Sequence, residues 1–326
     1  MSLAPLATPA ALPSGNTVRK TYAHLLEQLN TMSVHKAHDP FSDIAWDAPE
    51  NRIDPRDPRL QLPATHPLAG TQWYAGLSED ERTRFSVAWL AQTLKYGVGF
   101  EAVLNRGLLR YAQGLPNRSP EFRYVMHEVV EEGRHSLMFQ ELINRLGEDP
   151  QPVSRFHRFA DDRVAACGRT FPELFFFAVL GGEIFVDRQN RELLRQPRQA
   201  VHPLVRRVVQ IHVTEEARHL CFAEQYLREH LSRLSRSKKL ALSWIVPTLL
   251  TDPCRMMLVP TRALTRAFGI PDQTLREAFG PGTPHRDAVV AAARPVRKLC
   301  EQHGLFGPAQ ARLWRRLGLV HAGPVN

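Results

Sequence analysis

The chain contains the stretch Glu131-Glu132-Gly133-Arg134-His135 and, 84 residues later, its near copy Glu215-Glu216-Ala217-Arg218-His219. These stretches hold the only two Glu-x-x-His patterns of the sequence. Residues i and i+3 project from the same side of a helix, so the carboxylate and the imidazole of each pattern can approach one cation. We therefore expect each stretch to lie within a long helix and to contribute two donors to a metal site.

A single Glu in apolar surroundings precedes each pattern. Glu101 lies 31 residues before Glu132, and Glu183 lies 33 residues before Glu216. The chain thus repeats one unit, a helix with a Glu followed by a helix with Glu-x-x-His. Four carboxylates and two imidazoles on four inward-facing helices form the ligand set of ferritin-like di-iron and di-manganese carboxylate proteins. Burying a charged Glu among apolar residues is costly unless it is paired or coordinated, and metal binding removes that cost.

Each of these features has an ordinary structural explanation when it is taken alone. A Glu-x-x-His on a helix is usually a solvated pair, and a lone Glu more often faces solvent or pairs with an Arg. The coincidence of all six residues at matching places in a repeated pattern favours the metal site.

A third histidine lies on the same stripe as the second pattern. His212, Glu216 and His219 are spaced i, i+4 and i+7, so they share one helix face. The matching position in the first copy is Glu128, which makes the repeat imperfect. His212 is either a further metal-binding imidazole or a core or capping histidine. Glu128 and Asp187, each one turn from a candidate ligand, could orient the imidazoles.

Helical periodicity dominates the chain, and convincing strand alternation is absent. We predict an all-α fold, a ferritin-like four-helix bundle with additional N- and C-terminal helices. The bundle helices are expected at about 78–112, 119–147, 170–194 and 203–234. Further helices are expected at about 17–33, 238–268, 285–303 and 308–317. Residues 1–16, rich in Ala and Pro, are expected to form a flexible N-terminal segment, and residues 17–326 a single domain.

Two stretches interrupt this helical pattern. The Pro- and Asp-rich residues 39–67 predict a loop that follows the surface. The apolar stretch from Leu240 to Val259 contains Pro247 and Pro253 and predicts a Pro-broken helix pair rather than a membrane span.

Composition limits the class of protein. With 326 residues, 43% of them hydrophobic, the chain is long enough to bury a substantial core. Its net charge of +9 is mild at this length and no nucleic-acid reader motif accompanies it, so we expect no nucleic-acid partner. The four cysteines (Cys167, Cys221, Cys254 and Cys300) lie far apart, which suits a reducing cytoplasm and argues against disulfides or a zinc-thiolate site. The N-terminus lacks the pattern of a signal peptide, and we expect a cytoplasmic location.

These motifs resemble the p-aminobenzoate N-oxygenase type of non-haem di-iron oxygenase, over residues 17–319. The resemblance rests on Glu101, Glu132-x-x-His135, Glu183 and His212-x-x-x-Glu216-x-x-His219. His212 matches the histidine that distinguishes this family among ferritin-like proteins. The resemblance implies that residues 17–326 form one ferritin-like di-iron oxygenase domain with seven metal ligands and no catalytic residue beyond them (Glu101, Glu132, His135, Glu183, His212, Glu216 and His219).

The family also implies an activity. It predicts a monooxygenase of antibiotic biosynthesis that uses two iron ions and O2 to convert an aromatic amine into a hydroxylamine, nitroso or nitro product. Manganese remains open as the native metal. Electrons would come from a separate reductase, because the chain has no dinucleotide-binding fingerprint. The expected partners are therefore a small-molecule amine and an external electron donor, with no membrane; a homodimer is left open.

Candidates for substrate binding are fewer. The resemblance implies a carboxylate-bearing arylamine, and Arg294, Arg297 and Lys298 on a late helix could bind its carboxylate. An exposed basic helix face is an equally good explanation for these residues. Tyr96 could line a pocket mouth, although core packing is the simpler expectation, as it is for the aromatic run at 175–177.

Two other classes of function remain open. One is a di-iron monooxygenase or desaturase that acts on carbon. The other is a ferritin-like protein that stores or oxidises iron, or a radical-generating subunit. A radical subunit needs a redox tyrosine near the metals, and Tyr111 and Tyr124 lie ten residues after Glu101 and eight before Glu132.

Overall fold

The computed structural model describes residues 15–152 and 154–321, and within these residues all regular secondary structure is helical. The predicted all-α class is therefore confirmed. The flexible segment predicted for residues 1–16 lies outside the described residues as far as residue 14, and Gly15 already belongs to the first helix.

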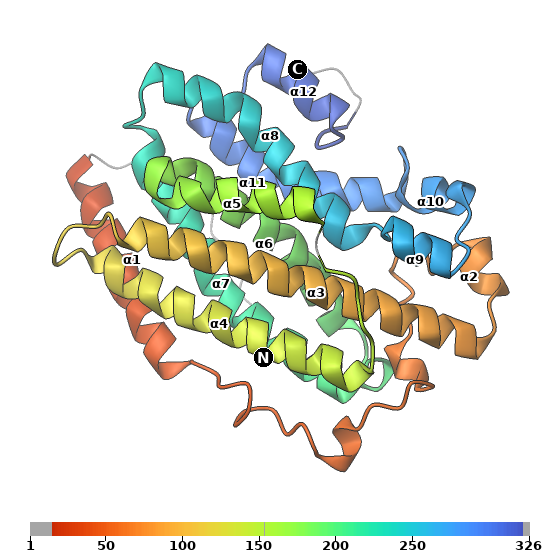
Figure 1. The fold of residues 1–326 in the computed structure, drawn as a ribbon. Coiled ribbons are helices and arrows are strands. Elements are labelled where there is room, and N and C mark those ends of the chain that lie inside the picture. Colours follow the sequence, from red (N-terminus) through yellow and green to blue (C-terminus); the bar gives the residue numbers. More distant parts are fainter. Residues whose placement is uncertain (1–14, 153, 322–326) are drawn as a thin grey trace.

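Four long helices form the bundle: α3 (Glu79–Ala112), α4 (Pro120–Leu146), α6 (Pro172–Arg195) and α7 (Pro203–Leu231). α3 packs along α4, and α6 packs along α7, so the chain forms two helical hairpins (Figure 1). Local sequence signals set the ends of these helices. Ser78 and Glu81 form a capping box before α3, α4 begins at Pro120, and Gly147 ends α4 with a positive φ of 70°.

The other helices surround this bundle. α1 (Gly15–His35) packs on α4 and α7, and α8 (Arg236–Leu258) and α11 (Pro284–Gln302) pack on α6. The remaining elements are short: α2 (Gln72–Gly76), α9 (Arg262–Ala267), α10 (Asp272–Phe279), α12 (Pro308–Arg316), and 3-10 turns at Pro49–Asn51, Pro58–Leu60 and Arg198–Ala200. The additional helices predicted at both ends of the bundle are present.

The sequence did not predict helix α5 (Arg155–Thr170), which packs against α3 and α6. The helix is mainly polar and contains few large apolar residues. It approaches α3 closely because Gly168 carries no side chain: a Cβ there would lie 2.1 Å from the carbonyl oxygen of Gly107. This close crossing, together with the fully buried Ala165, holds α5 against the bundle.

The Pro-broken helix pair predicted between Leu240 and Val259 is wrong. α8 is one continuous helix from Arg236 to Leu258, with Pro247 inside it. Leu242, Val246 and Leu250 are fully buried at i, i+4 and i+8, and this packed stripe outweighs the backbone hydrogen bond that Pro247 cannot make. No helix in the described part of the chain is long and apolar enough to cross a membrane.

Residues 36–71 form an irregular segment, here called the strap, which follows the outside of the bundle as predicted for residues 39–67 (Figure 1, orange-red). Hydrogen bonds fix it to three bundle helices. Arg145 of α4 donates to the carbonyl of Trp46, Arg207 of α7 donates to that of Asp43, and Ser86 of α3 accepts from the amide of Leu62. The strap is thus anchored along its length.

Two apolar clusters divide the bundle. One contains Phe175, Phe176 and Phe177, all fully buried, which confirms the aromatic run as core. The other, at the opposite end, includes Leu94, Met138 and Ile211. On α3, α4 and α7 the candidate metal-binding residues lie in sequence between these two clusters, and on α6 Glu183 lies between Leu180 and Phe185 of the first cluster. A polar layer is therefore enclosed by apolar core on both sides.

Candidate metal centre

Eight buried carboxylate and imidazole side chains from the four bundle helices converge in this layer. α3 contributes Glu101, α4 contributes Glu128, Glu132 and His135, α6 contributes Glu183, and α7 contributes His212, Glu216 and His219. All seven predicted ligands are in this set, together with Glu128. The structure therefore brings together every residue on which the di-metal hypothesis depends.

Close packing of small and aromatic residues brings α3 and α6 together at this layer. The ring of Phe100, next to Glu101, lies against the backbone of Gly182, next to Glu183; a Cβ on Gly182 would lie 2.1 Å from that ring. A glycine here allows the two solitary carboxylates to face the same space.

One group of donors joins α3, α4 and α7. Glu101, His135, His212 and Glu216 each offer one ligand atom, and these atoms lie within 4.8 Å of one another. His212 Nε2 is 3.5 Å from Glu101 Oε1 and 3.4 Å from Glu216 Oε1, and His135 Nδ1 is 3.2 Å from the same Glu216 oxygen. Two imidazoles and two carboxylates can thus hold one cation.

Two further groups lie beside the first. Glu128, Glu132 and His219 form one, and Glu101, Glu132 and Glu183 form the other, within the same 4.8 Å limit. The last group shares Glu101 with the four-residue group and Glu132 with the other three-residue group. A carboxylate that belongs to two donor groups can bridge two adjacent cations, and Glu101 and Glu132 are placed to do so.

Electrostatics indicate that the layer is built for cations. Burial, and then the charges of Glu132 and Glu216, raise the pKa of Glu101 well above its ordinary value. Burial, and then Glu216 and Glu101, do the same for the pKa of Glu183. Carboxylates crowded together away from water repel one another unless positive charge lies between them. The donor set therefore fits two divalent cations, and mixed oxygen and imidazole donors suit iron or manganese.

His212 differs from the other two imidazoles. Burial lowers its pKa to about 4, so the ring is neutral at neutral pH and keeps a lone pair for a metal. Its Nε2 faces Glu101 and Glu216, and its Nδ1 lies 3.2 Å from the amide nitrogen of Asn190. His212 is thus not a capping residue and lies inside the donor cluster.

Two carboxylates that the sequence analysis missed hold the other imidazoles crosswise. Nε2 of His219 on α7 lies 2.8 Å from Glu131 of α4, and Nε2 of His135 on α4 lies 2.9 Å from Glu215 of α7. Arg218 is buried between them, 2.8 Å from Glu131 and 3.7 Å from Glu215. In each case Nδ1 of the imidazole is left facing the donor cluster. The sequence signal that could have identified Glu131 and Glu215 was the pair of consecutive Glu residues at the start of both pentapeptides.

The strap supplies a further missed residue, His38. Its backbone N–H donates to Glu215 Oε1 at 3.0 Å, and its Nδ1 lies 3.2 Å from the same oxygen. The His38 side chain is 23% exposed, whereas Glu215 is buried. A chain of contacts therefore runs from the surface through His38 and Glu215 to His135.

The other predicted residues lie elsewhere. Asp187 pairs with Arg191 on its own helix, 2.7 Å apart, and it is Asn190 that contacts an imidazole. Arg294 and Lys298 are exposed on α11, and Arg297 pairs with Glu301 of the same helix. α11 packs on α6 with the opposite face, so the structure does not bring these basic residues to the cluster. Tyr96 is half-buried on α3, and burial raises its pKa.

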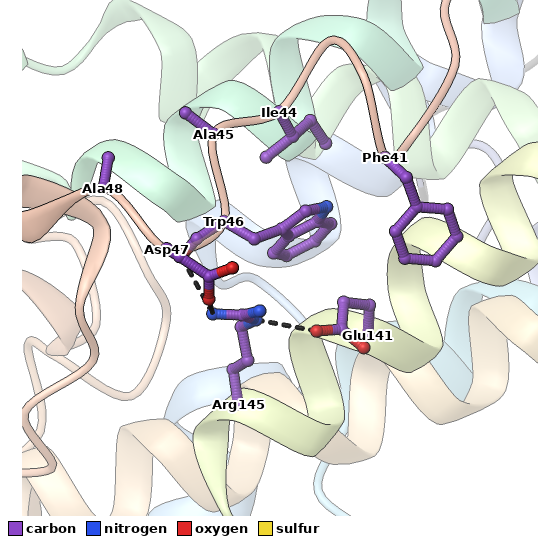
Figure 2. Close-up of a pocket in the computed structure, with 8 residues that line it drawn as sticks. All are labelled: Phe41, Ile44, Ala45, Trp46, Asp47, Ala48, Glu141 and Arg145. Atoms are coloured by element: carbon purple, nitrogen blue, oxygen red, sulfur yellow. Dashed lines mark hydrogen bonds and ion pairs between the residues drawn. The ribbon is translucent and has the colours of Figure 1, made fainter.

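A surface hollow of about 570 Å³ lies between the strap and α4 (Figure 2). Its lining consists of Phe41, Ile44, Ala45, Trp46, Asp47, Ala48, Glu141 and Arg145. Figure 2 shows the guanidinium of Arg145 between two carboxylates, 2.9 Å from Asp47 and 2.7 Å from Glu141. The positive charge of Arg145 is therefore already paired. The hollow contains none of the candidate metal-binding residues.

Comparisons with known proteins agree with this geometry. The model of the family described as p-aminobenzoate N-oxygenase AurF matches residues 19–304. Among individual proteins, an uncharacterized protein of Mycobacterium bovis and one of Mycobacterium tuberculosis strain H37Rv are each 36% identical over 294 residues. The match covers 90% of this chain and 86% of each relative.

Proposed function

Because the chain belongs to the p-aminobenzoate N-oxygenase family, a family of di-iron enzymes, we propose that it is an O2-dependent oxygenase that oxidises an aromatic amine at nitrogen. The observation that carries the proposal is the convergence of four carboxylates and three imidazoles, His212 among them, in one buried layer. In the first step the amine, O2, two electrons and two protons give the hydroxylamine and water. An external reductase supplies the electrons.

The seven converging side chains would hold two iron ions, which, when bound, supply the reduction of O2 and the transfer of one oxygen atom. The chain itself contributes the orientation of the donors. Glu131 and Glu215 each fix an imidazole through Nε2, so that Nδ1 faces inward. The apolar clusters on both sides of the layer keep bulk water away from the reacting groups.

The proposal is tested with iron-loaded, chemically reduced protein in single turnover. The protein is mixed with ¹⁸O2 and p-aminobenzoate or another arylamine, and the products are analysed by mass. We expect a hydroxylamine, nitroso or nitro product that carries ¹⁸O on nitrogen. The matched controls are Glu183→Ala, which removes a candidate ligand, and Glu141→Gln, which changes a carboxylate on the outside of α4.

The outcomes separate the functions. A label on carbon would replace N-oxygenation with a carbon monooxygenase, and loss of hydrogen without label would indicate a desaturase. Iron oxidation without any organic product would favour a ferroxidase or a radical subunit. For a radical subunit, Tyr124 is the tyrosine to examine, because its hydroxyl is fully buried and hydrogen-bonds to no described residue.

A further inference from the structure

Glu128 occupies the position in the first copy of the repeat that His212 occupies in the second. Glu128, Glu132 and His135 are spaced i, i+4 and i+7 on α4, as His212 and its two partners are on α7. This spacing puts all three side chains on one helix face. Since Glu132 and His135 face the donor cluster, Glu128 faces it as well.

Glu128 has no hydrogen-bond partner among the described residues, as is also true of the candidate ligand Glu216, whereas the neighbouring buried carboxylates Glu131 and Glu215 have partners. The exposure of Glu128 is 0%, and neither of its oxygens is hydrogen-bonded to any described residue. Glu131 has His219 and Arg218, and Glu215 has His135 and His38. Those two carboxylates are accounted for by their contacts within the protein. A fully buried carboxyl without a partner is costly, and Glu128 therefore needs another explanation.

The distances supply one. An oxygen of Glu128 and one donor atom each of Glu132 and His219 all lie within 4.8 Å of one another. Oxygen and nitrogen donors lie about 2.0–2.2 Å from Zn²⁺, and iron and manganese are divalent ions of similar size. Two donors on opposite sides of one such ion are therefore about 4.4 Å apart or less. The three side chains can thus surround a single cation.

We propose that Glu128 is an eighth ligand, binding the cation that Glu132 and His219 hold. This inference rests on the di-iron centre proposed above. The two ions are then unlike: one is bound by His135 and His212, and the other by one imidazole and an additional carboxylate. The five carboxylates then carry five negative charges, one more than the four positive charges of two divalent ions. This extra negative charge would stabilise the oxidised centre.

The test uses Glu128→Gln, which keeps the volume but removes the charge, and Glu128→Met, which is apolar and of similar shape. Glu141→Gln on the same helix is the control. Each protein is titrated anaerobically with ⁵⁷Fe(II) and examined by Mössbauer spectroscopy. We expect two ions per chain in the wild type and the control. In both Glu128 variants we expect one ion to bind at least about 10-fold more weakly and its quadrupole doublet to change. The reason is that loss of a direct ligand should reduce metal affinity at least as much as loss of a residue that only hydrogen-bonds to a ligand.

Thermal unfolding of the metal-free proteins adds a second readout. Glu128→Met should raise the melting temperature of the metal-free protein, because a partnerless buried carboxyl is removed, and should reduce the further rise that iron produces. If Glu128 instead had a purely structural role, Glu128→Met would lower the melting temperature of the metal-free protein. Circular dichroism verifies that each variant folds.

Two results overturn the assignment in distinguishable ways. If the wild type binds two ions and both Glu128 variants bind them with unchanged affinity and spectra, Glu128 is not a ligand and the di-iron centre stands. If the wild type takes up no iron, the di-iron centre fails, and the assignment of Glu128 fails with it.

Discussion

Oε2 of Glu131 on α4 lies 2.8 Å from Nε2 of His219 on α7. The reciprocal contact, Glu215 of α7 with His135 of α4, measures 2.9 Å. Each copy of the repeat therefore holds the imidazole of the other copy. The buried Arg218 lies between both carboxylates and ties the two contacts together.

Removing one crosswise carboxylate should weaken metal binding without removing a ligand. For Glu131→Ala we expect iron affinity to fall about 10–100-fold, because the ring of His219 loses its orienting partner. Anaerobic iron titration measures this, with Glu141→Gln as the control for loss of a carboxylate on α4. An unchanged affinity would mean that packing alone orients His219.

His212 should matter to one ion only. It lies in the group with Glu101, His135 and Glu216 and not in the group with Glu128, Glu132 and His219. For His212→Ala we therefore expect iron content to fall from two ions per chain toward one, with the folded helical content kept. Metal analysis after gel filtration measures it. Retention of both ions at wild-type affinity would remove His212 from the ligand set.

Iron binding should depend on pH in a defined direction. Burial alone would lower the pKa of His135, but contacts with Glu132 and Glu215 hold it well above its ordinary value. The pKa of His219 is raised in the same way by Glu216 and Glu132. The metal-free protein thus carries protons that a metal must displace, so binding releases protons and affinity rises as pH rises.

This pH dependence can be measured by iron titration in weakly buffered solution with a pH indicator, between about pH 6 and 8. Acidification on each addition of metal is expected. Binding with no proton release would show that both imidazoles are already neutral in the metal-free protein.

The crossing of α3 and α5 should be sensitive to a single methyl group. A Cβ on Gly168 would lie 2.1 Å from the Gly107 carbonyl oxygen, so Gly168→Ala should lower the free energy of unfolding by about 1–3 kcal/mol. Gly133→Ala is the matched helical control, because a Cβ there meets nothing within 4 Å; it should stabilise α4 by about 0.5–1 kcal/mol. The free energies of unfolding of both variants are measured by urea denaturation. Equal effects of the two substitutions would contradict the close crossing of α3 and α5.

Much of the site could be predicted because its residues follow helical spacing. Glu132 with His135, and His212 with Glu216 and His219, each share a face that periodicity alone defines. Periodicity could not show that Glu131 and Glu215 reach across to the other helix, since that depends on how α4 and α7 pack. His38 was missed because the strap has no regular spacing.

Tertiary contacts decided two points that the sequence could not. For Arg294 and Lys298 the sequence left open a substrate-binding role and an exposed basic helix face; Val289, Val296 and Leu299 bury the other face of α11 and leave these two residues exposed. The break expected in α8 relied on Pro247 and Pro253, and the packed stripe of this helix kept it continuous. In both cases the outcome was fixed by tertiary contacts.

The converging carboxylates and imidazoles are expected to hold two metal ions. The most direct measurement is the iron content of anaerobically loaded, desalted protein, compared with the double variant Glu101→Ala, Glu183→Ala. We expect two ions per wild-type chain and a marked loss in the double variant, with both proteins equally helical. A wild type that retains no iron, or a double variant that retains as much as the wild type, would contradict the account.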